Sequence, residues 1–217
     1  MLNSLLTNFF YMERLASRTY VRIPGFDPTL LDYLLVATPD EEVSAKLLEA
    51  GRSIPGQARK PKGQFNPYIK LAEFQARESM EDTIIRWVQR VCSQQQSFAV
   101  TLNNYGGFPP ATIFVRIQNH EPFRLLASKL QVIDEYVQSN SCPPVKFYSR
   151  PHLRIGEQPD EADYGRALFH YAQQDFHETF AVNELILMKS HNVFEQPKQV
   201  NVFRLYPLDV NRPAEMA

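Results

Sequence analysis

The sequence predicts an α+β protein of two pseudo-symmetric lobes, each an antiparallel sheet with flanking helices. Segments typical of strands alternate along the chain with amphipathic segments typical of helices, and the chain contains an internal repeat. Hydrophobic residues make up 44% of the 217 residues. This share is typical of a globular protein with a sizeable core and is wrong for a disordered chain.

The first element is a strand at 33–37, where a short apolar run precedes a polar turn. A helix is expected to follow, with Thr38 as its capping residue and Pro39 at the first helical position. Glu41 would complete a capping box. The apolar spacing predicts that this helix extends to about Gly51.

The other elements follow from the same two periodicities. Apolar residues at three- and four-residue spacing predict helices, and short runs of β-branched and aromatic residues predict strands. Helices are expected at 79–95, 121–137 and 160–175, and strands at 67–74, 98–102, 111–117, 145–148, 151–155, 180–188 and 200–205. A turn-rich stretch is expected around Gly106-Gly107.

The length fits one large domain or two small fused lobes. We assign 26–210 to a single bilobal domain and 1–25 to an N-terminal extension that packs on it. The N-terminus has no basic residue before Arg14 and no long apolar run, which predicts neither a signal peptide nor a membrane span. Cys92 and Cys142 lack metal-type spacing and are typical of reduced thiols. We therefore expect a cytoplasmic protein with no metal and no cofactor.

Charge and glycine content limit the kind of ligand. The formal net charge is −1, whereas proteins that bind long nucleic acid through its phosphates are usually basic. The chain has 8 glycines, and none belongs to a G-x-G-x-x-G or G-x-x-x-x-G-K-[ST] motif. A small anionic ligand held in a local basic pocket is compatible with both observations.

The most informative feature is a repeated heptapeptide. The residues at 67–73, Pro-Tyr-Ile-Lys-Leu-Ala-Glu, match those at 151–157, Pro-His-Leu-Arg-Ile-Gly-Glu. The terminal proline and glutamate are identical, and four of the five residues between them keep their apolar, basic or small character. The exception sets Tyr68 against His152.

Two further matches follow in the same order, 98–100 with 180–182 and 114–117 with 202–205. The offsets of the three matches are 84, 82 and 88 residues. Three ordered matches at nearly one offset predict a duplicated strand–helix–strand–strand unit, at about 66–120 and 150–206. Two such units predict two lobes related by a pseudo-twofold axis.

The two heptapeptides also predict the place of a site. Alternate side chains of a strand point to opposite faces of the sheet, so Tyr68 and Lys70 share one face of their strand. His152 and Arg154 do the same in the other copy. If the lobes face each other, these four side chains meet across a shared cleft.

These residues resemble the two-histidine phosphoesterase superfamily of 2′-5′ RNA ligase-like and cyclic phosphodiesterase-like proteins. Its members carry two His-x-Thr/Ser-x motifs, each on a strand and often after a proline. Pro-His152-Leu-Arg154-Ile resembles the second motif, and Pro-Tyr68-Ile-Lys70-Leu stands where the first is expected. The resemblance covers most of 31–206 and implies a 2′-5′ RNA ligase-like fold.

The resemblance also implies roles. In the family, two histidines transfer protons and two hydroxyl residues hold the phosphate; here only His152 matches, which makes the first motif degenerate. Imidazole titrates near pH 6.5, so His152 could act as the base, and Tyr68 could donate a proton but would be a poor base. Lys70 and Arg154 replace both hydroxyl residues and could hold the phosphate as cations.

Three functions remain open. The leading prediction is a protein that binds a phosphorylated small ligand, a nucleotide or an RNA end in the cleft, with little or no standard two-histidine activity. The second is an active cyclic phosphodiesterase or 2′-5′ RNA ligase-like enzyme of altered mechanism, slowed by about 10²–10⁴ through the loss of one acid–base partner. The third is a non-catalytic scaffold, in which Glu73 and Glu157 pair with the two cations and neutralise the cleft.

Overall fold

A computed structural model describes residues 29–52, 67–109, 111–157, 161–191 and 195–207. The predicted N-terminal extension, 1–25, lies outside these ranges. The strands are β1 (Leu30–Ala37), β2 (Ile69–Arg77), β3 (Phe98–Phe108), β4 (Thr112–Ile117), β5 (Lys146–Phe147), β6 (Leu153–Glu157), β7 (His177–Val182), β8 (Glu184–Ser190) and β9 (Lys198–Arg204). The helices are α2 (Glu41–Arg52), a 3₁₀ turn η1 (Glu78–Met80), α3 (Glu81–Cys92), α4 (Glu121–Lys129), α5 (Gln131–Ser139) and α6 (Glu161–Ala172).

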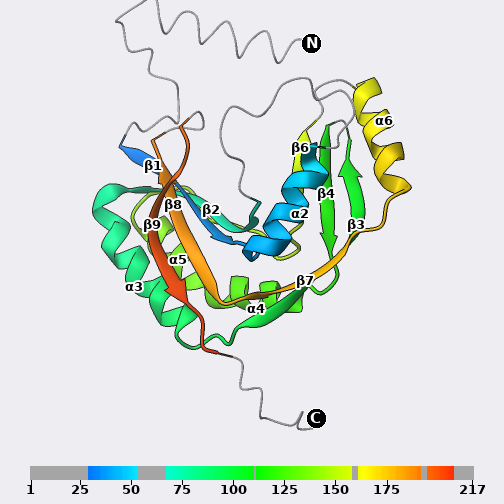
Figure 1. Cartoon of the computed structure of the whole chain (residues 1–217). Helices are drawn as coiled ribbons and strands as arrows, with labels where there is room; N and C mark the ends of the chain where they lie inside the picture. Colours follow the sequence, from blue (N-terminus) through cyan, green and yellow to red (C-terminus); the bar gives the residue numbers. More distant parts are fainter. Residues whose placement is uncertain (1–28, 53–66, 110, 158–160, 192–194, 208–217) are drawn as a thin grey trace, which may run out of the picture.

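The strands form two antiparallel sheets (Figure 1). One sheet has five strands in the order β5-β2-β1-β8-β9, and the other has four in the order β6-β4-β3-β7. Helices flank both sheets, which confirms the predicted α+β class with two lobes. In the described part of the chain, no helix is both long enough and apolar enough to cross a membrane.

Each lobe takes elements from both halves of the sequence. β2 belongs to the five-stranded sheet, but β3 and β4, which follow it, belong to the other. α2 follows β1 of the five-stranded sheet and packs on β6 and β7 of the four-stranded one, whereas α4 follows β4 and packs on β2. A copy of the repeat therefore does not correspond to one lobe, because strands and helices are exchanged between the two.

Both strands of the repeated heptapeptide contain a β-bulge. The pairing of β1 with β2 skips Leu71, and the pairing of β4 with β6 skips Ile155. These two residues are 84 positions apart, which is the offset of the heptapeptide match. A bulge shifts the alternation of side chains by one position, so residues three apart can share a face of the strand.

The other two matches behave differently. The segments 98–100 and 180–182 pair with each other, with Ala99 opposite Ala181, as a local twofold axis would place them. The segments 114–117 and 202–205 fall mainly on β4 and β9, which are not equivalent: β4 lies beside β6, and β9 lies at a sheet edge beside β8. The internal duplication stays a prediction that the bulges and the central pair support.

The start of α2 differs from the prediction. Asp40 caps the helix in place of Thr38, since its Oδ1 accepts a hydrogen bond from the backbone N–H of Val43 at 2.9 Å. The helix begins at Glu41, so Pro39 lies outside it. The short side chain of an aspartate can reach a free backbone N–H three residues later, which explains why Asp40 caps the helix.

Three other expectations were wrong. The segment 180–188, expected as one strand, is divided between β7 and β8, which belong to different sheets. Gly106-Gly107 lies inside β3 and not in a turn, because Gly106 lets the ring of Phe114 approach closely: a Cβ there would lie 2.8 Å from that ring. The helix expected at 121–137 is two helices that meet at Leu130, whose φ of −80° and ψ of −3° interrupt the α geometry. A single apolar spacing continues across both helices, so the break has no signal in the periodicity.

The contact between α2 and β6 can be tested with two glycines. A Cβ on Gly51, in the last turn of α2, would lie 2.8 Å from the carbonyl oxygen of the bulge residue Ile155. We expect Gly51→Ala to lower the free energy of unfolding by about 1–3 kcal/mol, measured by urea denaturation. The control is Gly165→Ala on the exposed side of α6, where a Cβ meets nothing within 4 Å. This control should raise it by about 0.5–1 kcal/mol, and equal shifts in the two variants would contradict the proposed contact.

Candidate functional site

A cavity of about 220 Å³ lies where the two bulged strands meet. It is lined by Tyr68, Lys70, Phe108, Thr112, Tyr148, Pro151, His152 and Arg154. Tyr68 and His152 immediately precede β2 and β6, and Lys70 and Arg154 lie within these strands. The structure therefore brings the four residues singled out in the sequence together, two from each sheet.

Four lining residues were missed as site residues. Phe108 ends β3, Thr112 begins β4, and Tyr148 follows β5. They reach the cavity because β4 pairs with β6 and because the backbone N–H of Tyr148 donates to the carbonyl of Leu71 at 2.9 Å. No local pattern in the sequence signals these long-range contacts. Pro151 belongs to the repeated heptapeptide and was quoted there without a role.

His152 is half-buried among aromatic rings. Its ring centroid lies 4.9 Å from that of Phe108 and 4.8 Å from that of Phe114. Burial is the main reason that the pKa of His152 lies below its ordinary value of 6.5, and the charges of Arg154 and Lys70 lower it further. The imidazole is therefore neutral at pH 7, which is the form that can accept a proton.

Lys70 is paired with a carboxylate. Its Nζ lies 3.1 Å from Oε2 of Glu73, and the same oxygen accepts a hydrogen bond from the hydroxyl of Tyr148 at 2.7 Å. The bulge at Leu71 explains why residues three apart in a strand share a face. The hydrogen bond from Tyr148 is the main reason that the pKa of Glu73 is lowered, and Lys70 adds to this effect.

This ion pair is one of the two that the scaffold alternative expects in the cleft. The side chains of Lys70 and Glu73 are 39% and 46% exposed, so their ion pair contributes at most about 1 kcal/mol. An anionic ligand therefore has little to overcome in displacing Glu73. The side chain of Glu157 lies outside the described residues, so the matching pair with Arg154 stays a prediction.

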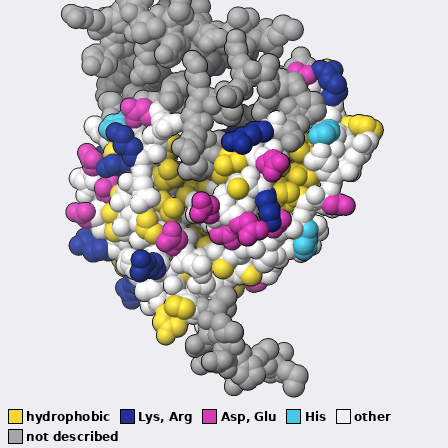
Figure 2. Space-filling view, viewed as in Figure 1, with side chains coloured by type: hydrophobic (Ala, Val, Ile, Leu, Met, Phe, Trp, Pro, Cys, Tyr) yellow, Lys and Arg dark blue, Asp and Glu magenta, His cyan; other side chains and the backbone are white. Residues whose placement is uncertain are grey.

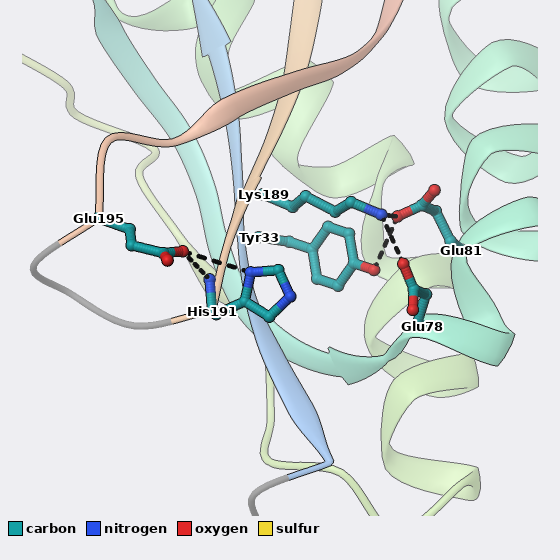
Figure 3. A network of polar contacts seen from close by, with 6 residues as sticks. All are labelled: Tyr33, Glu78, Glu81, Lys189, His191 and Glu195. Carbon is teal, nitrogen blue, oxygen red and sulfur yellow. Dashed lines mark hydrogen bonds and ion pairs between the residues drawn. The ribbon is translucent and has the colours of Figure 1, made fainter.

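A second polar cluster does not line the cavity (Figure 3). Lys189 lies 2.8 Å from Glu81 and 2.9 Å from Glu78, and Tyr33 donates to Glu81 at 3.0 Å. Burial and then this hydrogen bond raise the pKa of Tyr33 above its ordinary value. The cluster ties β1 and β8 to the start of α3, which is a structural role. Within the described ranges, no group of three or more His, Cys, Asp or Glu could hold a metal ion.

Comparison with protein families decides the classification. Residues 39–193, well over half of the chain, match the model of the 2′-5′ RNA ligase superfamily. The chain belongs to the 2′-5′ RNA ligase superfamily. This membership confirms the resemblance to two-histidine phosphoesterases. No curated protein matches the sequence.

Solved structures show the same fold. The protein TT0787 of Thermus thermophilus is 19% identical, with a TM-score of 0.64 over 82% of this chain and 99% of that one. E. coli LigT in its apo form is 16% identical, with a TM-score of 0.59 over 82% of this chain and 98% of that one. LigT has also been solved with 3′-AMP, with phosphate and with ATP. At these identities the likeness shows the superfamily fold alone.

The electrostatic coupling within the cavity predicts a titration. By NMR, the C–H resonances of His152 should titrate below pH 6.5. Arg154→Ala and Lys70→Ala should each raise the pKa of His152, because each removes a cation that disfavours imidazolium. Lys129→Ala, which removes an exposed cation bonded to Gln95, serves as the matched control. A pKa of His152 that is the same in all four proteins would show that the two cavity cations do not act on it.

Proposed function

We propose that this protein binds the phosphate group of a nucleotide-type ligand in the cavity between β2 and β6, with little or no standard two-histidine catalysis. One observation carries the proposal: Lys70 and Arg154, from two different sheets, line one small cavity together with His152. Two cations that face one cavity repel each other, and a phosphate between them relieves this repulsion.

The pKa of His152 supports the electrostatic part of the proposal. Burial lowers this pKa most, and the charges of Arg154 and Lys70 lower it further, which is consistent with two cations close to the imidazole. An arginine can hold two phosphate oxygens at once, whereas a lysine acts as a point charge. We therefore expect Arg154 to hold two phosphate oxygens and Lys70 to attract the phosphate as a point charge.

The size of the cavity favours a small ligand or a chain end. A volume of about 220 Å³ lies below the usual range for drug-sized ligands, about 300–1,000 Å³, and suits a phosphate with an attached sugar. On the face shown in Figure 2, the basic and acidic side chains of the described residues are interspersed. The complexes of LigT with phosphate and 3′-AMP support this ligand class, since LigT has the same fold.

A second candidate is an active cyclic phosphodiesterase or 2′-5′ RNA ligase-like enzyme of altered mechanism. It is favoured by the neutral His152, which shares the cavity with the phenol of Tyr68. In this mechanism, His152 takes a proton from the attacking water as the water oxygen bonds to phosphorus. Tyr68 then gives its proton to the oxygen that leaves the cyclic phosphodiester. The third candidate is a scaffold, in which the cavity binds no ligand.

Phosphate binding is tested by calorimetry with inorganic phosphate and with 3′-AMP. Arg154→Ala should weaken both by about 10- to 100-fold, the cost of losing a charge-assisted hydrogen bond. Lys129→Ala, outside the cavity, should leave both affinities unchanged. If the wild-type protein binds neither ligand, the proposal is wrong and the scaffold is favoured.

The ion pair between Lys70 and Glu73 predicts that a variant of Glu73 binds phosphate more tightly. Glu73→Gln removes the carboxylate charge beside Lys70 and can keep a hydrogen bond to Tyr148. We expect phosphate to bind about 2- to 5-fold more tightly, in line with the small energy of an exposed ion pair. Weaker binding in this variant would mean that Glu73 positions Lys70 for the ligand and does not compete with it.

Turnover separates the two leading candidates. With 2′,3′-cyclic AMP as substrate and product analysis by chromatography, we expect the same background rate from the wild-type protein and from His152→Ala. A wild-type rate that falls about 10²-fold or more in His152→Ala would identify the altered-mechanism enzyme instead. Tyr68→Phe should then slow the reaction as well, because its ring keeps the shape of Tyr68 and lacks the proton.

A further inference from the structure

Phe108 is an exposed aromatic ring at the cavity. It is 50% exposed, although it lines the cavity together with the cationic residues. Its ring lies 4.5 Å from that of Phe114, with an interplanar angle of 27°, and 4.9 Å from that of His152, which it meets edge-on at 71°. One face of Phe108 is therefore covered by Phe114, and half of the side chain remains open to a ligand.

The ring of Phe108 has a buried support. Phe114 is buried, and the approach of its ring to Gly106 leaves no room for a Cβ there. Phe108 therefore rests on a closely packed aromatic ring at the end of β3. A preorganised ring of this kind binds a flat partner with little loss of conformational entropy.

We propose that Phe108 is a stacking platform for the nucleobase of the ligand whose phosphate is held by Arg154. The proposal rests on the function proposed above and adds a ring-binding subsite to it. Every base has a π-face, and stacking on an aromatic side chain tolerates different bases. The edge contact of Phe108 with His152 places this subsite next to the phosphate-binding part of the cavity, as the two ends of one nucleotide require.

Exposure alone does not carry the inference. Among the described residues, Leu125, Phe169 and Tyr206 are also large, hydrophobic and exposed, and none of them lines the cavity. Phe108 differs because it combines exposure with a place beside His152 and a stacked support. Phe169, which is 69% exposed on α6, supplies a matched control of the same residue type.

The test compares 3′-AMP with inorganic phosphate in four proteins: wild type, Phe108→Ala, Phe108→Tyr and Phe169→Ala. Phe108→Ala should weaken 3′-AMP binding by about 5- to 100-fold, the usual effect of removing one stacking ring, and should leave phosphate binding unchanged. Phe108→Tyr should keep the affinity for 3′-AMP, and Phe169→Ala should change neither. Urea denaturation of each variant shows whether the fold is retained.

Several results would overturn the inference. If Phe108→Ala weakens phosphate and 3′-AMP alike, the ring only supports the pocket. If it weakens neither, or if the wild-type protein binds 3′-AMP no more tightly than phosphate, there is no base subsite and the proposed phosphate function stands alone. If phenyl phosphate binds as tightly as 3′-AMP, the assignment to a nucleobase is wrong. If wild type binds no ligand at all, the proposed function fails together with the subsite.

Discussion

The cavity depends on two bulged strands that are held in register by elements from the other half of the chain. At the bulge of β2, the carbonyl of Leu71 accepts a hydrogen bond from the backbone of Tyr148. At the bulge of β6, the carbonyl of Ile155 is approached by the last turn of α2 at Gly51. Each bulge residue therefore has its carbonyl beside a segment that is distant in the sequence.

These bulges also determine the electrostatics of the site. Because Leu71 is an extra residue, Lys70 lies beside Glu73 on the face that lines the cavity. The resulting site contains two cations, a neutral imidazole and a nearby carboxylate that takes part of one charge. Such a set offers positive charge to an anion, and His152 is the one histidine among the residues that line the cavity.

Much of this arrangement was predictable, for identifiable reasons. The heptapeptide match placed Tyr68, Lys70, His152 and Arg154 at one cleft, because the match and the alternation of side chains along a strand can both be read from the sequence. The exchange of helices between the sheets was not predictable, since it depends on packing between segments that lie far apart in the sequence. Phe108 and Tyr148 were missed as site residues for the same reason. Thr38 was predicted as the N-cap of α2 because Thr38 and Asp40 are both residue types that cap helices. The hydrogen bond from Val43 to Asp40 identifies Asp40 as the cap.

The exchange of strands has a consequence for how the protein is made. β1, near the start of the described chain, pairs with β8, so that residue 32 lies opposite residue 190. During synthesis, β1 must remain without this neighbour until β8 has left the ribosome. Pairings of such high sequence separation form slowly and leave strand edges exposed meanwhile. The five-stranded sheet, which includes the strand that carries Lys70, can therefore be complete only after β8 and β9 have been synthesised.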